Sequence, residues 1–325
     1  MHRFAASVVA LLALSGAVSA SADWVRREET AMGTRIYVEA WDDDPVRGEQ
    51  ALDAVMANMH RIDELMSHYK PESQLSRINA RAALEPVVVD PELFELLRTS
   101  IHYSELTEGA FDITYASVGY LYDYPRHVHP TQAQIEAALP GVNYRNLVLD
   151  PATHSVRFAH EGMRIDLGGI AKGYACDRGA EILKTFGIRN AVVTAGGDTR
   201  LLGDRRGRPW LIGIRHPDDK NRVVLSMPLA DVGISTSGDY ERFFDEGGVR
   251  YHHIIDPRTG RSPNGVRSVT IIGPTATDTE GWSKGVFVKG AAEGLRLIEH
   301  YPQMDAVVVD RDGKVWYTKG LQPPK

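Results

Sequence analysis

The chain has 325 residues, of which 43% are hydrophobic and 25% charged, a composition typical of a globular protein that buries a large core. Its formal net charge of −6 lacks the basic excess of a sequence-independent nucleic-acid binder, so nucleic acid is excluded as an expected partner. The single cysteine, Cys176, allows no internal disulfide. Because it lies in an Ala/Gly-rich stretch, it is expected to be a packed small residue rather than a nucleophile.

Residues 1–22 have the pattern of a signal peptide. Arg3 supplies a basic start, an apolar run extends from Phe4 to Leu14, and small residues follow as a cleavage box. The run is short for a membrane span, and no cysteine follows it that a lipid anchor could use. The sequence therefore predicts an exported protein in which residues 23–325 form one domain.

Helices and strands alternate along the rest of the chain without a regular repeat. Apolar residues recur at helical spacing over residues 52–66, and Asp90-Pro91 predicts a helix that ends near Gly109. Further helices are expected from Thr131 to just before Pro140 and over residues 170–186. The expected strands are 146–149, 155–158, 163–167, 190–194, 210–214, 223–227, 268–272 and 305–310. Several strands are close enough for hairpins, so we predict an α+β fold with a mixed, largely antiparallel sheet and packed helices.

The segment RIDLGGIAKG, residues 164–173, has a pattern suited to binding an anion. An expected strand ends in Asp166, Gly168-Gly169 makes a turn, and the first turn of the next helix carries Lys172. Glycines let a backbone approach a ligand, a helix N-terminus offers free N–H groups, and lysine adds a positive charge. The pattern suits a phosphate or pyrophosphate, although it matches neither the dinucleotide fingerprint nor the P-loop, and a simple tight turn remains an alternative.

Two further segments are glycine- or hydroxyl-rich. Gly196-Gly197-Asp198 follows an expected strand and is either a turn or a place where the backbone lies close to a ligand. The hydroxyls of residues 233–244 are assigned to turns and caps, and the absence of a G-x-S-x-G elbow gives a serine hydrolase little support.

Histidines and aromatic residues provide other candidates. His252 and His253 are adjacent on an expected strand, so they point to opposite faces and only one of them is expected to enter a site. A zinc-binding pair is therefore not favoured. Tyr69 and Phe111 follow the first and second long helices, and each is either a core residue or a flat surface for a planar ligand.

The segment TEGWSKGVFVKG, residues 279–290, places Glu280, Ser283 and Lys284 at helical spacing i, i+3 and i+4. Their side chains are expected to share one helix face. From the spacing alone, this face is either a metal site or a solvated ion pair.

Taken together, these segments resemble the FAD:protein FMN transferase family, also called the ApbE family. The resemblance implies that FAD and a divalent cation, usually Mg2+, are used to attach FMN through its phosphate to a Thr or Ser hydroxyl of a target protein, with release of AMP. It also implies a membrane-associated or periplasmic redox protein as the target, which agrees with a periplasmic location. The matches run in chain order over 32–34, 67–79, 109–112, 165–173, 195–198, 233–238, 253–260 and 307–320.

The resemblance also implies a set of site residues. His253 is expected to be the base near the reacting phosphate, and Lys172 is expected to hold the phosphates together with the Gly168-Gly169 turn. An imidazole titrates in the range that a base requires. The positions that match the family's FAD-binding residues are Met32, Tyr69, Gly109, Ala110, Phe111, Asp166, Lys172, Asp198 and Ile255.

The family's metal-binding positions are altered in this chain. By resemblance the ligands would come from Gly169, Glu280, Ser283 and position 284, but the family's aspartate is Glu280 here and its threonine is Lys284. Glutamate keeps an oxygen ligand, whereas a protonated lysine cannot coordinate a cation. Three outcomes stay open: Glu280, Ser283 and backbone carbonyls near Gly169 hold the cation, the Lys284 ammonium partly replaces it, or activity is lost.

Two alternative functions need almost the same residues. Water could replace the target hydroxyl, so that FAD is hydrolysed to FMN and AMP. The protein could also be a non-catalytic FAD-binding protein with an altered metal site.

Overall fold

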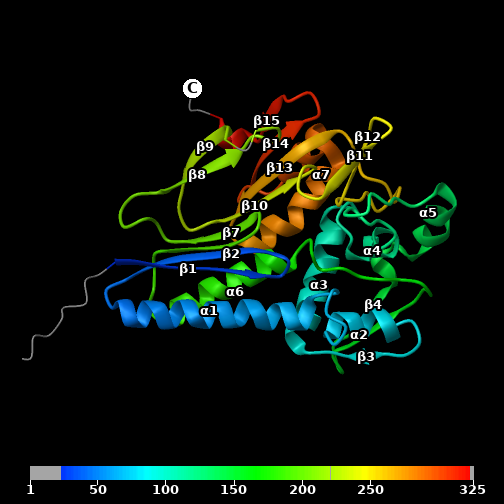
Figure 1. Ribbon diagram of the computed structural model, residues 1–325, viewed down its shortest axis with the longest axis horizontal. Helices are drawn as coiled ribbons and strands as arrows, with labels where there is room; N and C mark the ends of the chain where they lie inside the picture. Colours follow the sequence, from blue (N-terminus) through cyan, green and yellow to red (C-terminus); the bar gives the residue numbers. More distant parts are fainter. Residues whose placement is uncertain (1–22, 220, 323–325) are drawn as a thin grey trace, which may run out of the picture.

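An eight-stranded sheet forms the centre of the structure. The computed structural model describes residues 23–219 and 221–322 (Figure 1). Along the sheet the strand order is β1-β2-β6-β7-β10-β13-β14-β15, and every neighbouring pair is antiparallel. The strands are β1 Asp23–Ala31, β2 Thr34–Asp42, β6 Ala191–Ala195, β7 Asp198–Leu202, β10 Gly233–Gly238, β13 Val266–Gly273, β14 Asp305–Asp310 and β15 Val315–Tyr317. The predicted α+β class and largely antiparallel sheet are confirmed.

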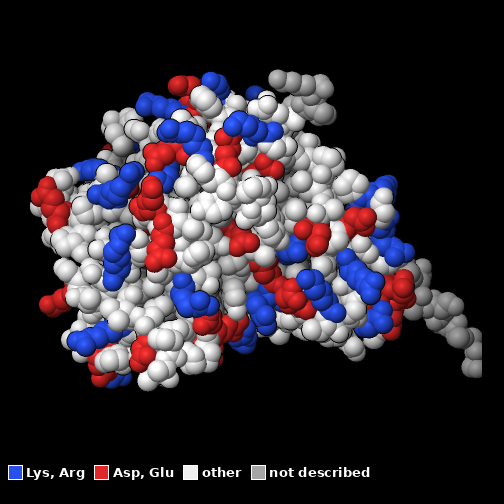
Figure 2. Space-filling view, turned by 180° about the vertical axis from the view of Figure 1, so that it is seen from behind, with Lys and Arg blue, Asp and Glu red and all other residues white. Residues whose placement is uncertain are grey.

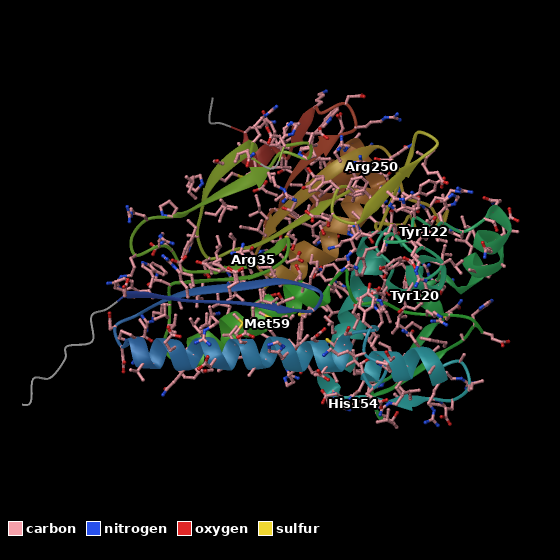
Figure 3. The ribbon with its side chains drawn as sticks, in the orientation of Figure 1. Arg35, Met59, Tyr120, Tyr122, His154 and Arg250 are labelled. Atoms are coloured by element: carbon pink, nitrogen blue, oxygen red, sulfur yellow. The ribbon has the colours of Figure 1, made fainter. Side chains whose placement is uncertain are left out.

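The two faces of this sheet bury different clusters because side chains alternate along each strand. Helices α1 (Pro45–Met66), α6 (Ala171–Thr185) and α7 (Ala276–Ile298) cover one face, on which Val193 and Val308 belong to the main core. Their neighbours Val192 and Val307 point to the other face and pack under the hairpin of β8 (Trp210–Arg215) and β9 (Val223–Leu229). Met59 of α1, labelled in Figure 3, is fully buried close to Gly179 of α6.

Smaller elements gather beside one end of the sheet, to the right in Figure 1. They include a three-stranded sheet of order β3-β5-β4 and the separate hairpin β11–β12. The elements are α2 Gln74–Arg81, β3 Val87–Val88, α3 Pro91–Leu106, α4 Ala116–Gly119, α5 Gln132–Ala138, β4 Leu147–Asp150, β5 Ser155–Phe158, β11 Phe243–Glu246, β12 Val249–His252 and the 3-10 helices η1 Ile113–Tyr115, η2 Leu139–Gly141 and η3 Tyr144–Asn146. A further 3-10 helix, η4 Lys319–Leu321, follows β15 near the C-terminus.

The segment from Met163 to Leu167 differs from its prediction, because no strand forms there. Ile165 is paired by a side chain instead: the Asn79 Oδ1 accepts its N–H at 2.8 Å, and the Asn79 amide nitrogen donates to its carbonyl at 2.9 Å. One amide side chain thus takes the place of a neighbouring strand, which a hydrophobicity pattern cannot reveal.

Helix starts follow the expected capping chemistry. Asp90 and Thr131 cap α3 and α5 as predicted, and Thr131 forms a capping box with Gln134. α1 begins at Pro45, seven residues before the predicted start, because Asp44 caps it and Pro45 occupies the first position.

The surface of the described residues carries both signs of charge. On the face shown in Figure 2, basic and acidic side chains are interspersed. In the described ranges, no helix combines the length and apolarity needed for a membrane span. The predicted signal peptide lies outside the described residues.

Candidate functional site

The N-termini of α6 and α7 meet at the centre of the candidate site. A Cβ at position 173 would lie 2.2 Å from the carbonyl oxygen of Ala276, so only glycine allows this approach. The Gly173 N–H donates to the Oε2 of Glu280 at 2.7 Å. Asp177 of α6 in turn accepts the N–H groups of Ala276 and Thr277 at 2.9 and 2.7 Å, and so caps α7. Sequence reasoning missed Asp177, because its partners lie about a hundred residues away.

Two lysines and two carboxylates form a cluster where these helices meet. The Nζ of Lys172 contacts Glu280 Oε1, lies 3.1 Å from Asp198 Oδ2 and donates to the carbonyl oxygen of Gly168 at 2.8 Å. The Nζ of Lys284 lies 3.2 Å from the same Oε1 of Glu280. The structure therefore brings together four residues that the sequence analysis placed in one site: Lys172, Asp198, Glu280 and Lys284.

Burial and charge shift the pKa values of this cluster in different directions. Burial alone would lower the pKa of Lys172, but the charges of Asp198 and Glu280 outweigh it and raise that pKa. Burial tends to raise the pKa of Glu280, whereas the two lysines lower it, and the lysines prevail. Burial and the nearby Glu280 raise the pKa of Asp198, so Glu280 carries the firmer negative charge.

The ammonium groups form the solvent-facing layer of the cluster. The side chains of Lys172 and Lys284 are 21% and 19% exposed, whereas those of Glu280 and Asp198 are 0% and 2% exposed. An i, i+4 pair that is buried in this way is not the solvated ion pair that the spacing alone allowed.

The Gly168-Gly169 turn lies next to this layer. A Cβ at Gly169 would lie 3.4 Å from the ring of Phe111 and 3.8 Å from Cε of Lys284. Phe111 is buried beneath the turn, and its N–H is held by the Thr107 hydroxyl at 2.9 Å. The Gly109-Ala110-Phe111 segment that follows α3 therefore supports the predicted phosphate-binding turn.

The hydroxyls assigned to turns and caps have a different role. Ser235 and Ser237 lie within β10 and face α7, where their Oγ atoms lie 2.9 Å from Thr279 Oγ1 and 3.0 Å from Ser283 Oγ. Ser283 also donates to the Glu280 carbonyl at 2.9 Å. The prediction that these hydroxyls serve turns and caps is wrong for Ser235 and Ser237. Both serines lie in strand β10, and their hydroxyls form hydrogen bonds with residues of helix α7.

His253 follows β12 and is partly buried. Its backbone N–H donates to the carbonyl of Arg242 at 3.1 Å, while its Nδ1 is buried without a hydrogen-bond partner among the described residues. Burial and the nearby positive charges, including those of Lys284 and Lys172, lower the pKa of His253 to about 3, so the ring is neutral at pH 7. His252 points elsewhere, with its Nε2 2.7 Å from the Pro263 carbonyl oxygen, so the two histidines do diverge.

Arg242 links three parts of the site and was not singled out in the sequence. Its guanidinium donates to the Tyr69 hydroxyl at 3.2 Å, and it lies near Gly33 in the turn between β1 and β2. Met32 occupies this turn with a φ of 54°, next to Gly33 at 68°. Tyr69 is 68% exposed, so it is not a core residue, although the His68 ring lies against its ring.

Asp166 lies between the Gly168-Gly169 turn and His68. Its Oδ1 accepts the Gly168 N–H at 2.7 Å, and its Oδ2 lies 3.3 Å from Nδ1 of His68, whose ring lies against that of Tyr69. Burial would raise the pKa of Asp166, but His68 prevails and lowers it. His68 lies within the matched segment 67–79 but was not predicted as a site residue.

The structure also places three other positions that the sequence analysis singled out. In the turn between β6 and β7, Gly196 has a φ of 61° and Gly197 lies against the Thr236 carbonyl of β10, so the segment before Asp198 is a turn, and its approach to a ligand stays a prediction. Ile255 is buried in a separate cluster with Val118 and Tyr122, the latter labelled in Figure 3. Cys176 is fully buried, and burial raises its thiol pKa, which agrees with a packing role.

The residues assigned to a cation do not fit one in their present arrangement. Both carboxylate oxygens of Glu280 already accept donors, from two lysines and from Gly173, and the Ser283 hydroxyl is bonded within the protein. The fourth position, Lys284, offers an ammonium, which has no lone pair for a metal while it is protonated. Across 23–219 and 221–322, no group of three or more His, Cys, Asp or Glu side chains is arranged to hold a metal.

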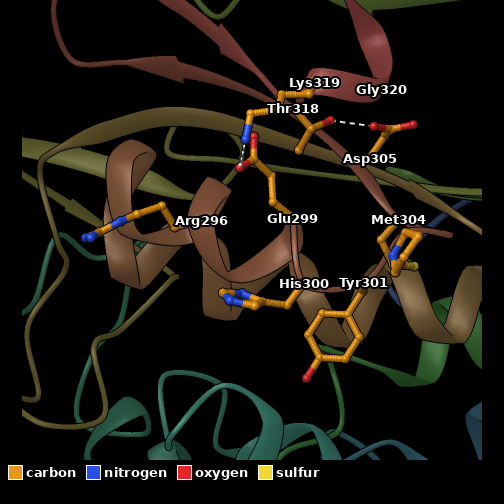
Figure 4. Close-up of a pocket in the computed structure, with 10 residues that line it drawn as sticks. Arg296, Glu299, His300, Tyr301, Met304, Asp305, Thr318, Lys319 and Gly320 are labelled. Atoms are coloured by element: carbon orange, nitrogen blue, oxygen red, sulfur yellow. Dashed lines mark hydrogen bonds and ion pairs between the residues drawn. The ribbon is translucent and has the colours of Figure 1, made fainter.

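A separate pocket of about 400 Å³ lies near the C-terminal end of α7 (Figure 4). Lys319 and Glu299 form an ion pair of 3.0 Å at this pocket. None of the predicted site residues lines it, so we assign the site to the cluster described above. The lining residues are Arg296, Glu299, His300, Tyr301, Pro302, Met304, Asp305, Thr318, Lys319 and Gly320.

Solved structures identify the class of protein. The crystal structure of the ApbE protein from Thermotoga maritima has a TM-score of 0.85 at 34% identity and covers 92% of this chain and 98% of that chain. The flavin transferase ApbE from Vibrio cholerae has a TM-score of 0.81 at 29% identity, covering 92% and 98%. The fold is thus that of the flavin transferases.

Sequence comparison identifies the family. The sequence profile of the ApbE family matches residues 32–308, so the chain belongs to the ApbE family. A curated relative, the FAD:protein FMN transferase of Treponema pallidum, is 32% identical over 314 residues, which span 91% of this chain and 87% of that protein. The resemblance found in the sequence is confirmed.

Proposed function

We propose that this protein transfers FMN from FAD, through a phosphoester bond, to a Thr or Ser hydroxyl of a target redox protein and releases AMP. The observation that carries the proposal is the lysine–carboxylate cluster beside the Gly168-Gly169 turn, where the resemblance leads us to expect the FAD phosphates. Membership of a family whose curated members are named FAD:protein FMN transferases supports the same reaction.

The residues present suit attack on a pyrophosphate. The acceptor hydroxyl attacks the phosphorus on the FMN side, the bond from this phosphorus to the bridging oxygen breaks, and AMP leaves with that oxygen. Positive charge and N–H donors stabilise the charge that develops on the phosphoryl oxygens. Lys172 keeps positive charge next to the Gly168-Gly169 turn, and the N-terminus of α6 adds its dipole.

His253 is proposed as the base that accepts the hydroxyl proton. Its imidazole is neutral at pH 7, which is the form that accepts a proton. The low pKa applies to the site without substrate, and a bound pyrophosphate would raise it because a nearby negative charge favours the imidazolium. Its unpartnered Nδ1 is consistent with a nitrogen that bonds to substrate.

The test is incubation of the purified protein with FAD and a candidate acceptor, followed by mass spectrometry of the acceptor and chromatography of the nucleotides. Transfer predicts an FMN adduct on the acceptor and one AMP per adduct. Lys172→Met should abolish both, whereas Lys184→Met, a change of an exposed lysine in the same helix, should not. Full transfer by a folded Lys172→Met variant would contradict the assignment of the site.

The same assay separates the alternatives. Free FMN and AMP without an adduct would favour hydrolysis, and retention of intact FAD would favour a binding protein. We further propose that the protein acts after export, in the periplasm, on a periplasmic or membrane-associated target, because residues 1–22 have the pattern of a signal peptide.

A further inference from the structure

Lys284 holds the most available positive charge in the site. An ammonium has three N–H donors. Lys172 directs its donors to three acceptors: Gly168, Asp198 and Glu280. Within the described part of the chain, Lys284 Nζ has one partner, the Oε1 of Glu280, which leaves two donors for a ligand.

The position of Lys284 directs these donors toward the proposed reaction centre. Its Cε lies 3.8 Å from the position of a Cβ on Gly169, in the turn proposed to hold phosphate. Because Glu280 and Asp198 lie behind the lysines and are almost fully buried, a ligand entering from solvent meets ammonium groups before carboxylates. A divalent cation would instead need those carboxylate oxygens to face the ligand.

We propose that the Lys284 ammonium, held in place by Glu280, takes the place of a divalent cation as the charge that contacts the FAD pyrophosphate. The inference rests on the proposed function, since it takes FAD as the ligand. Lys172 then has a supporting role: it compensates the buried charges of Glu280 and Asp198 and leaves Lys284 free to bind.

This arrangement has a physical advantage and a cost. A tethered ammonium is always present in the site and does not have to be recruited from solution. It carries one charge rather than two and makes hydrogen bonds rather than coordinate bonds, so it orients phosphate oxygens less strictly. The expected signature is FAD binding that does not depend on Mg2+.

The experiment measures the dissociation constant of FAD by flavin fluorescence, in EDTA and in millimolar Mg2+, without any acceptor protein. Lys284→Met removes the charge and keeps the length, whereas Lys284→Thr also supplies a hydroxyl. Lys289→Met, a change of a lysine in the same helix that pairs with Glu108 and Glu293, is the matched control. A parallel titration with Mn2+, followed by electron paramagnetic resonance, measures cation binding to the free protein, and thermal melts check that each variant is folded.

The wild type should bind FAD equally well in EDTA and in Mg2+ and should hold no stoichiometric Mn2+. Lys284→Met should bind FAD more weakly by roughly tenfold in both conditions, because a charged hydrogen-bond donor is lost. Lys284→Thr should be similarly weak in EDTA and recover with Mg2+, while Lys289→Met should bind as the wild type does.

Two results would overturn the inference and leave the proposed function intact. The first is FAD binding by the wild type that strengthens about tenfold or more when Mg2+ is added. The second is stoichiometric Mn2+ binding by the wild type that is lost in Glu280→Gln. Unchanged FAD affinity in a folded Lys284→Met variant would also overturn it. A wild type that binds no FAD in either condition would instead refute the proposed function, and the inference with it.

Discussion

Glu280→Gln tests whether the cluster depends on a buried negative charge. The substitution keeps the size of the side chain and removes the charge between Lys172 and Lys284. If the new amide nitrogen faces Lys172 and Lys284, its N–H groups oppose the ammonium N–H groups and no hydrogen bond can form. If it faces Gly173, it loses the 2.7 Å hydrogen bond from that N–H. Neither orientation restores the native contacts.

The expected cost follows from burial. Removing one partner of a buried ion pair costs about 3–5 kcal/mol because the other charge is left uncompensated. Here Lys172 keeps Asp198 and the partly exposed Lys284 can turn to solvent, so we expect about 3 kcal/mol, or a fall of roughly 5–10 °C in Tm. Because the lysines lower the pKa of Glu280 below its ordinary 4.5, this stabilisation is complete above that pH and is lost as the pH falls through the lowered value.

The assay is equilibrium unfolding in urea at pH 7 and again in acid, where the difference between wild type and variant should narrow. Glu293→Gln is the control, because Glu293 pairs with Lys289 in the same helix but is 51% exposed. It should cost at most about 0.5 kcal/mol. If Glu280→Gln cost no more than Glu293→Gln, the cluster would be a solvent-screened pair and the reasoning from burial would be wrong.

Three other substitutions test separate parts of the site. Gly173→Ala should lower Tm and weaken FAD binding, because a Cβ 2.2 Å from the Ala276 carbonyl forces α6 and α7 apart at a cost of about 1–3 kcal/mol. The folded pKa of His253, about 3, lies below its ordinary 6.5, so the unfolded state binds a proton first as the pH falls. The wild type should therefore lose about 2 kcal/mol of its free energy of unfolding between pH 7 and pH 5. His253→Gln should lose less over the same pH range in urea unfolding. Tyr69→Ala should leave Tm nearly unchanged, since the residue is 68% exposed, yet weaken FAD binding by about 0.5–1.5 kcal/mol in a fluorescence titration, whereas Tyr69→Phe should retain most of the affinity.

Local patterns were enough to predict most elements of this fold but not their arrangement. The caps at Asp90 and Thr131 and the apolar stripe of α1 depend on neighbours within a few residues, and these predictions were confirmed. β2 pairs with β6, which begins about 150 residues later, and only tertiary packing decides that pairing. The segment from Met163 to Leu167 failed for the same reason, because its partner is the distant side chain of Asn79.

The site shows the same division between local and distant determinants. The turn Gly168-Gly169 followed by Lys172 could be predicted as a helix start, since the glycines and the lysine lie within five consecutive residues. The roles of Asp177 and Arg242 could not be predicted, because their partners come from remote segments. Asp177 binds the first turn of α7, and Arg242 binds Tyr69. Resemblance to the family located positions but said nothing of contacts.

Helix α7 contains two Lys–Glu pairs four residues apart, and they differ in burial as well as in order, since the second runs from Lys to Glu and spans Gly290, where a φ of 82° interrupts the helix. In the sequence, Glu280 with Lys284 and Lys289 with Glu293 are both ordinary i, i+4 pairs. Gly173 brings α6 close enough to cover Glu280 completely, whereas nothing comparable covers Glu293, which stays half exposed. Burial makes the first carboxylate a fixed negative charge, and this charge holds two ammonium groups at the surface of the site. A lysine at position 284 is therefore compatible with a working site if its charge reaches the pyrophosphate, which Mg2+-independent binding of FAD would reveal.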